Sequence, residues 1–183
     1  GGYLDHILHV IKNSLMIKKQ YEGNGVKPIH SDTDVVLAAM FHDLGKLGDG
    51  TQPYYKYQTD DWRRKKLNEW YTHNKDLDYM TVHDRALWIL AKYHVDVNPH
   101  VYKAIISADG LFDPAAETYF RAYNDTRHVL GSIVHFGDWL STICEKQNWM
   151  QGEEEHQDEH VVHKKSSDKD IKNMKEKFDE LFN

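Results

Sequence analysis

The first part of the chain carries apolar residues at steps of three and four, the spacing of one helical face. These residues are Leu4, Ile7, Leu8, Ile11, Leu15 and Met16. The stretch EGNGVKP that follows contains two glycines and a proline, which typically end helices. The pattern predicts a first helix over residues 3–21.

A second apolar run, VVLAAMFHDLGKLGDG at residues 35–50, follows a helix-start signal. Ser31 with Asp34 three residues later has the spacing of a capping box, in which the two residues satisfy each other's backbone N–H groups. Glycine commonly follows the last turn of a helix. We therefore predict a second helix over residues 32–44, ended by Gly45.

His42 and Asp43 fall in the last turn of that predicted helix, after an almost wholly apolar run. A buried carboxylate costs several kcal/mol unless something pairs with it. A cation is the simplest partner. The alternative is a helix end at which His42 binds the last carbonyls and Asp43 makes a local turn.

Residues 48–79 mix aromatic residues with the basic run WRRKK, Trp62 to Lys66. Glycine and proline in the first part predict a loop, and the second part predicts a short helix, so we interpret this segment as a lid or insertion. The basic run would bind phosphates while Tyr54, Tyr55, Tyr57 or Trp70 stack on a base. We favour the simpler alternative of a solvated helix face with aromatic residues in the core.

Helical patterns resume beyond this segment, with candidate caps at Asn98, Asp113 and Asp125. The segments are residues 81–94, 98–109, 113–124 and 125–149. Alternation of apolar and polar residues, the mark of a strand, is nearly absent. We therefore predict an all-α fold.

The chain becomes charged after Met150 and then ends in a short amphipathic pattern. Ser167 with Asp170 gives a capping signal. One apolar stripe contains Ile171, Met174, Phe178 and Leu181. We expect a single domain over residues 1–150, then a linker and a helix over residues 151–183 that docks on the domain or on a partner subunit as an oligomer contact.

Composition narrows the setting and the partners. The 183 residues, 40% of them hydrophobic, suffice for one domain with a substantial core. The single cysteine, Cys144, excludes an internal disulfide and a thiolate zinc cluster, which favours a reducing, cytoplasmic setting. No apolar run is long enough to span a membrane and no signal peptide is visible. The net charge of −6 argues against a general nucleic-acid coat protein.

Histidine is abundant, with thirteen in the chain, and it is the commonest metal ligand. Asp138 stands in the apolar segment IVHFGDWLS, and His6 and His9 lie three residues apart on one face of the first predicted helix. Together with His42 and Asp43 they offer imidazole and carboxylate without thiolate. Such ligands suit Mn, Mg, Fe, Co, Ni or Zn with positions left open for water.

The order of His6, the doublet in FHDLGK and Asp138 resembles the H...HD...D signature of the HD superfamily of metal-dependent phosphohydrolases. The start GGYLDHILHV is also similar to the first-helix motif in HD domains of some exoribonucleases and relaxase-associated proteins. The resemblance covers residues 1–147. It implies an HD-type helical bundle with a metal held by His6, His42, Asp43 and Asp138, and it selects His6 over His9, which we interpret as a helix-packing residue.

Some HD proteins bind a second metal through two further histidines. His83 resembles the first of these, and we count it among the catalytic candidates; the alternative is a surface histidine next to Asp84. The second normally lies in an I-x-x-H-H-G turn, where this chain reads AIISADGLFD with Ala108 and Asp109. Either Asp109 replaces one ligand or the site holds a single ion, and we favour one ion.

The resemblance implies that Lys46 lies near the substrate phosphate, whereas the alternative is a cation that complements a helix end. We expect Arg121 and Arg127 to help bind the substrate by complementing phosphoryl charge. The leading hypothesis is hydrolysis of a nucleotide phosphoester or phosphoanhydride by a metal-activated water that Asp43 helps to position.

A small nucleotide is favoured over RNA or DNA because the acidic chain lacks a continuous basic track. The nearest alternative is an HD-type nuclease acting on single-stranded RNA or DNA. More distant alternatives are a di-iron oxygenase, which needs both extra histidines, and a non-catalytic binding module stabilised by metal.

Overall fold

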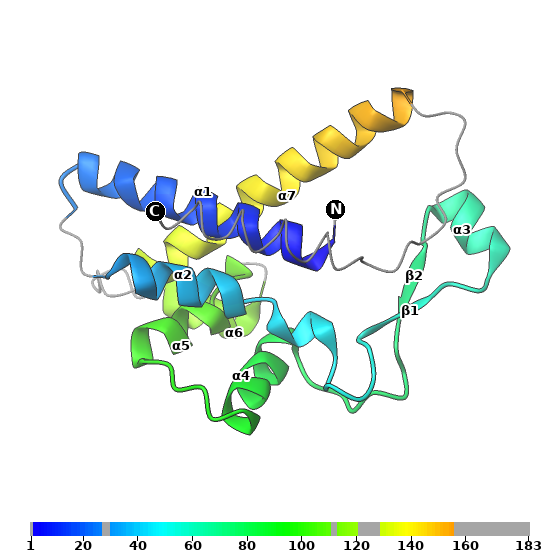
Figure 1. The fold of residues 1–183 in the computed structure, drawn as a ribbon, viewed down its shortest axis with the longest axis horizontal. Helices are drawn as coiled ribbons and strands as arrows, with labels where there is room; N and C mark the ends of the chain where they lie inside the picture. Colours follow the sequence, from blue (N-terminus) through cyan, green and yellow to red (C-terminus); the bar gives the residue numbers. More distant parts are fainter. Residues whose placement is uncertain (1, 27–29, 111–112, 121–128, 156–183) are drawn as a thin grey trace, which may run out of the picture.

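The computed structural model describes residues 2–26, 30–110, 113–120 and 129–155, and this part of the chain is mainly helical (Figure 1). The helices are α1 (Tyr3–Gly23), α2 (Asp32–Phe41), the 3-10 helix η1 (Leu44–Leu47), α3 (Asp61–Leu67), α4 (Val82–Lys92), α5 (Pro99–Ile106), α6 (Pro114–Phe120) and α7 (Val129–Glu155). The strands are β1 (Tyr55–Tyr57) and β2 (Tyr71–His73). The mainly helical character predicted from the sequence is confirmed.

The core forms where α1, α2, α5 and α7 pack against one another. Each helix contributes apolar side chains from its inner face: Ile7, Val10 and Ile11 from α1, Val35, Ala38 and Ala39 from α2, Val101, Ala104 and Ile105 from α5, and Leu130, Ile133 and Val134 from α7. These side chains are 5% exposed or less. Of the apolar face predicted for the first helix, Ile7 and Ile11 lie in the core, whereas Leu4 and Met16 are exposed.

Helix α2 begins as predicted and ends earlier. Ser31 and Asp34 form the expected capping box. The helix stops at Phe41, and the chain then turns into η1, which contains Gly45. A Cβ on Gly45 would lie 2.0 Å from the carbonyl oxygen of Val82, so glycine allows η1 to pack against the start of α4. The role predicted for Gly45, ending α2, is wrong, because this glycine is needed for a tertiary contact.

A second glycine brings α7 close to α1. A Cβ on Gly137 would lie 2.2 Å from the Ser14 hydroxyl oxygen and 3.0 Å from the Ser14 backbone nitrogen. Any larger residue would therefore push the two helices apart. Because Gly137 directly precedes Asp138, this close approach also sets the distance between Asp138 and the side chains of α1.

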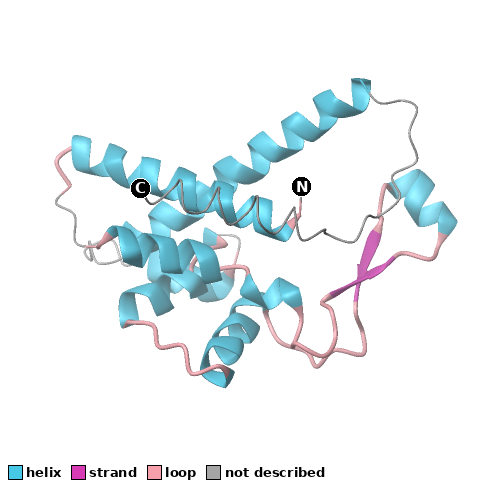
Figure 2. Cartoon of the chain, viewed as in Figure 1, coloured by secondary structure: helices cyan, strands magenta, loops and turns pink. Residues whose placement is uncertain are grey.

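Residues 55–73 form a projection that we name the arm (Figure 2). Strands β1 and β2 pair in antiparallel fashion, with Tyr55 opposite His73 and Tyr57 opposite Tyr71, and α3 lies between them along the chain. The short helix is confirmed, but the strands were not predicted. All of their residues are exposed, so they lack the alternation that marks a half-buried strand.

Helix α7 continues past Met150 to Glu155, into the segment predicted as the start of a charged linker. The predicted C-terminal helix and the candidate cap Asp125 lie outside the described residues. Within the described ranges, no helix combines the length and the apolar character needed to cross a membrane.

Candidate metal centre

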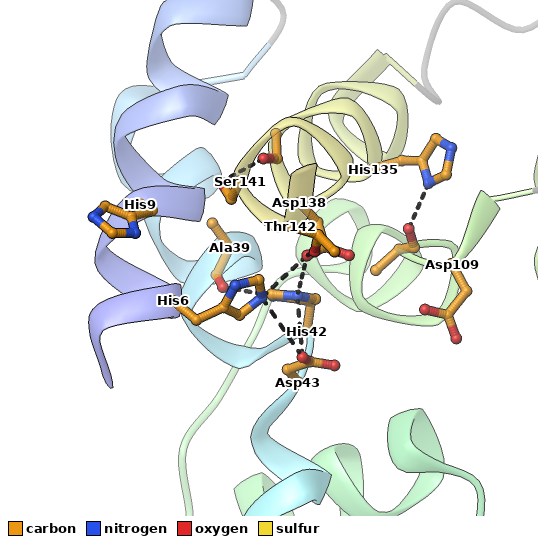
Figure 3. Close-up of polar contacts among 12 residues, drawn as sticks. His6, His9, Ala39, His42, Asp43, Asp109, His135, Asp138, Ser141 and Thr142 are labelled. Carbon is orange, nitrogen blue, oxygen red and sulfur yellow. Dashed lines mark hydrogen bonds and ion pairs between the residues drawn. The ribbon is translucent and has the colours of Figure 1, made fainter. Parts of the chain in front are cut away.

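Two histidines and an aspartate from three separate helices meet at one point (Figure 3). His6 comes from α1, His42 caps the end of α2, and Asp138 belongs to α7. Oδ1 of Asp138 lies 3.1 Å from Nε2 of His6 and 3.7 Å from Nε2 of His42. One ligand atom from each residue lies within 4.8 Å of the other two. The structure thus brings together three of the residues predicted as metal ligands.

Asp43, the fourth predicted ligand, is buried beside them. Its Oδ2 atom lies 3.7 Å from Nε2 of His42 and 3.9 Å from Nε2 of His6. The Lys46 ammonium, one turn of η1 further on, donates a hydrogen bond to the same oxygen at 2.6 Å. Lys46 therefore does more than complement a helix end, because it neutralises a buried carboxylate at the centre.

The backbone fixes which nitrogen of His42 points inward. Nδ1 of His42 donates a hydrogen bond to the carbonyl oxygen of Ala39 at 2.8 Å, which leaves the lone pair of the neutral ring on Nε2. That Nε2 atom is buried and has no hydrogen-bond partner. A buried, unpaired acceptor aimed at two carboxylates is the arrangement that a cation would satisfy.

Glu145 gives His6 the same orientation. Nδ1 of His6 lies 3.0 Å from Oε2 of Glu145, and Nδ1 of His9 lies 2.7 Å from Oε1 of the same carboxylate. Since a carboxylate accepts, the neutral His6 ring carries its lone pair on Nε2, facing Asp138. The role predicted for His9 is wrong: its side chain is exposed and hydrogen-bonds to Glu145 instead of packing in the helix interface.

Glu145 was not among the predicted site residues, although the sequence carries a usable signal. It lies seven residues after Asp138, two helical turns along the same face of α7. That spacing makes Glu145 a candidate partner for the two histidines on one face of α1. The contact still depends on how α1 crosses α7, which the sequence pattern does not fix.

The electrostatics of the centre favour positive charge. Burial opposes protonation of His42, but Asp138 and Asp43 raise its pKa above the ordinary value. Burial likewise opposes protonation of His6, whereas Asp138 and Glu145 raise its pKa. Burial of Asp138 favours its neutral form, yet the two imidazoles hold the pKa of this carboxyl well below its usual range. Facing acceptors of this kind need a proton or a metal cation between them.

The donor set fits a divalent ion. Ligands about 2.1 Å from one metal and 90° to 110° apart lie about 3.0 to 3.4 Å from each other. The four separations between imidazole and carboxylate in this centre run from 3.1 to 3.9 Å, so small side-chain movements would bring the donors into range. Two neutral imidazoles with two carboxylates suit Mn, Fe, Co, Ni or Zn.

The centre opens into a pocket of about 480 Å³. The pocket is lined by Gly2, Tyr3, His6, Asp43, Lys46, Tyr55, Asp138, Thr142 and Glu145. Burial opposes the charged form of Lys46, but Asp43 raises the pKa of its ammonium, so a cation faces the pocket. Tyr55 enters from the arm. The pocket therefore combines a candidate metal site, a positive charge and an aromatic ring.

A second histidine–aspartate group lies around His83. This residue is 4% exposed, so the alternative of a surface histidine is wrong. Its Nε2 atom lies 3.5 Å from Oδ2 of Asp109, and its Nδ1 atom lies 3.5 Å from Oδ2 of Asp113. One atom from each of the three lies within 4.8 Å of the others, so this group also has the composition of a metal site. None of the three is among the residues found lining the 480 Å³ pocket.

Arg121 and Arg127, predicted to bind the substrate, lie outside the described residues.

Comparisons of the chain with protein families, with curated proteins and with solved structures found no match. The site must therefore be judged on its own geometry.

Proposed function

We propose that the protein is a metal-dependent phosphohydrolase with an HD-type helical bundle, acting on a phosphoester or phosphoanhydride bond of a nucleotide. The supporting observation is the convergence of His6, His42 and Asp138, with Asp43 beside both histidines, at a pocket that Lys46 also lines. The proposal assigns one divalent ion to these four residues.

An ion held there would lower the pKa of a water molecule and withdraw charge from a phosphoryl group. Asp43, beside the two histidines, would accept a hydrogen bond from the attacking water and orient it. Asp138 and the two histidines fix the centre from α1, α2 and α7, so the reacting groups meet with little rearrangement.

Lys46 supplies charge for the substrate. An ammonium has three donors, so Lys46 can keep its bond to Asp43 while it binds a phosphoryl oxygen. In a partly closed pocket such a fixed cation stabilises the negative charge that develops in the transition state. The pocket volume lies in the range that holds small-molecule ligands, which accommodates one nucleotide unit.

The test is hydrolysis by the purified protein, with each candidate divalent ion in turn. The substrates are bis(p-nitrophenyl) phosphate and a panel of ribonucleotides and deoxyribonucleotides. We expect turnover that EDTA abolishes and that His6→Gln removes. His94→Asn is the matched control, because His94 is exposed and has a positive φ that asparagine tolerates. Failure of every substrate with every ion would refute the proposal.

A further inference from the structure

Aromatic rings share one face of the arm. Tyr55 stands opposite His73 and Tyr57 stands opposite Tyr71. Directly opposite residues, and residues two apart on a strand, point to the same side of a sheet. The ring centroids are 5.3 Å apart in the first pair and 6.4 Å apart in the second. We name these four rings the aromatic ladder.

The tyrosines of the aromatic ladder are exposed to solvent, although large side chains of this kind are usually well buried. Tyr55, Tyr57 and Tyr71 are 42%, 48% and 53% exposed. Residues two apart on a strand are separated by about 6.6 Å, which is about two base steps of 3.4 Å in a stacked nucleic-acid strand. Successive bases of a single strand stack on exposed aromatic rings whatever their sequence.

The ladder leads out of the pocket. Tyr55 is at once its first ring and part of the lining of the pocket that contains Asp43 and Lys46. The Tyr54 ring meets the Tyr55 ring edge to face, with their centroids 4.7 Å apart. A strand lying on the ladder would therefore have one end at the candidate metal centre.

Positive charge lies at the far end of the ladder. The arm contains five basic and three acidic residues, in a chain whose net charge is −6. Arg64 lies over the Tyr57 ring, 5.0 Å from its centroid, and pairs with Asp61, while Arg63 pairs with Glu69.

Two of these cations remain free of local partners. Lys65 and Lys66 on α3 are exposed, and no acidic residue in the described part of the chain forms an ion pair with them. Cations beside stacking rings are the combination that binds single-stranded nucleic acid.

We propose that the arm binds single-stranded nucleic acid and delivers its terminal nucleotide to the pocket. The proposal rests on the phosphohydrolase function and names its substrate class. In the reaction, the oxygen of water bonds to phosphorus while the bond from phosphorus to a sugar oxygen breaks. One product gains a phosphate monoester, and the other gains a hydroxyl group that carries a proton from the water.

Binding can be measured without turnover, by the fluorescence anisotropy of labelled oligouridylate and oligothymidylate of about twelve nucleotides in EDTA. Stacking is worth about 1 to 3 kcal/mol per base, so Tyr57→Ala and Tyr71→Ala should each weaken binding about fivefold to a hundredfold. Tyr57→Phe keeps the ring and should keep most of the affinity. Tyr102→Ala, an exposed tyrosine on α5, is the matched control and should have no effect.

The contribution of Lys65 and Lys66 can be measured separately, through the salt dependence of binding. Replacing both lysines, Lys65→Gln with Lys66→Gln, should weaken binding and flatten its salt dependence by about 0.7 in log–log slope for each lost phosphate contact. Lys19→Gln, on the exposed side of α1, should leave the slope unchanged. The proposal would be overturned if the wild type bound no oligonucleotide, or if all the arm variants bound as tightly as the wild type. The exposed rings would then be better explained as a contact surface for a protein partner.

The two proposals fail separately. If the arm variants lose oligonucleotide binding but still hydrolyse bis(p-nitrophenyl) phosphate at the wild-type rate, both proposals stand. If the wild type hydrolyses mononucleotides but neither binds nor cleaves oligonucleotides, the arm proposal fails and the phosphohydrolase proposal survives. If oligonucleotides bind through the arm and no substrate is hydrolysed with any ion, the phosphohydrolase proposal fails, and of the arm proposal only the binding of single-stranded nucleic acid survives.

Discussion

The protein contains two groups of histidine and aspartate with similar composition and different geometry. In the central group, His6 and His42 each turn one ring nitrogen outward to a fixed acceptor and the other inward to Asp138. In the second group, Asp109 and Asp113 approach opposite nitrogens of the single His83 ring.

The two groups differ in the number of imidazoles and in how the ring nitrogens are directed. Acceptors beyond Nδ1 of His6 and His42 set the ring tautomers, so both Nε2 atoms can serve one ion. The second group has a single imidazole, which offers an ion at most one lone pair, whereas the central group offers two. The central group is therefore the better candidate for a metal site, and of the two groups it alone contributes to the lining of the 480 Å³ pocket.

The largest effect that we expect is at Asp43. Asp43→Asn keeps the shape but removes the charge that would bind the ion, so hydrolysis should fall by about a thousandfold or more. Asp109→Asn is the same change in the second group and should cost less than about tenfold. Rates on bis(p-nitrophenyl) phosphate, together with metal content by mass spectrometry, would measure both. Equal losses in the two variants would contradict the distinction between the groups.

Lys46 should come next. Lys46→Met removes the charge that faces the phosphoryl group, so kcat/KM should fall by an amount worth about 2 to 4 kcal/mol while metal content stays the same. A rise in KM alone would place the lysine on a remote phosphate. Lys92→Met is the control, because Lys92 lies over the Trp88 ring and outside the pocket lining. If Lys46 only complemented the end of a helix, Lys46→Met would leave the kinetics almost unchanged.

The third prediction concerns Glu145, the carboxylate that accepts a hydrogen bond from His6 in the central group. Glu145→Ala frees the His6 ring, and losses of this kind typically cost about 10-fold to 100-fold in metal affinity. Titration calorimetry with Mn²⁺ would measure the change. Glu22→Ala removes a glutamate of α1 that pairs with Lys18 and should leave the affinity as it is. If Glu145→Ala bound Mn²⁺ as tightly as the wild type, Glu145 would have no role in orienting His6 for the ion, and only its contact with His9 would remain.

Local signals in the sequence predicted the parts of the fold that depend on local structure. The capping box of Ser31 with Asp34 and the N-cap Asn98 each act within one helical turn, and each is confirmed. The apolar face of α1 is confirmed at its centre, where Ile7 and Ile11 are buried. The convergence of His6, His42 and Asp138 was expected only through the resemblance to HD proteins, because periodicity alone does not say which helices cross.

Features that depend on distant contacts were not predicted. Gly45 was assigned to the end of a helix, although glycine is required there because the backbone of Val82 leaves no room for a Cβ. Strands β1 and β2 have three exposed residues each and carry no burial pattern to detect. Glu145 matters through the crossing of α1 and α7. In each case the deciding neighbour lies far away in the sequence.

The smallest effect should be at His83, where the comparison can be broken most directly. His83→Gln keeps a polar side chain between Asp109 and Asp113, so kcat/KM should fall less than about tenfold and the number of bound ions should not change. Some loss of stability is expected, because a buried polar group left without partners costs about 1 to 3 kcal/mol. A thermal melt measures that loss separately from the kinetics. His6→Gln serves as the matched change in the central group. A loss of a hundredfold or more in His83→Gln, together with one fewer ion per chain, would show that the second group also binds a catalytic metal.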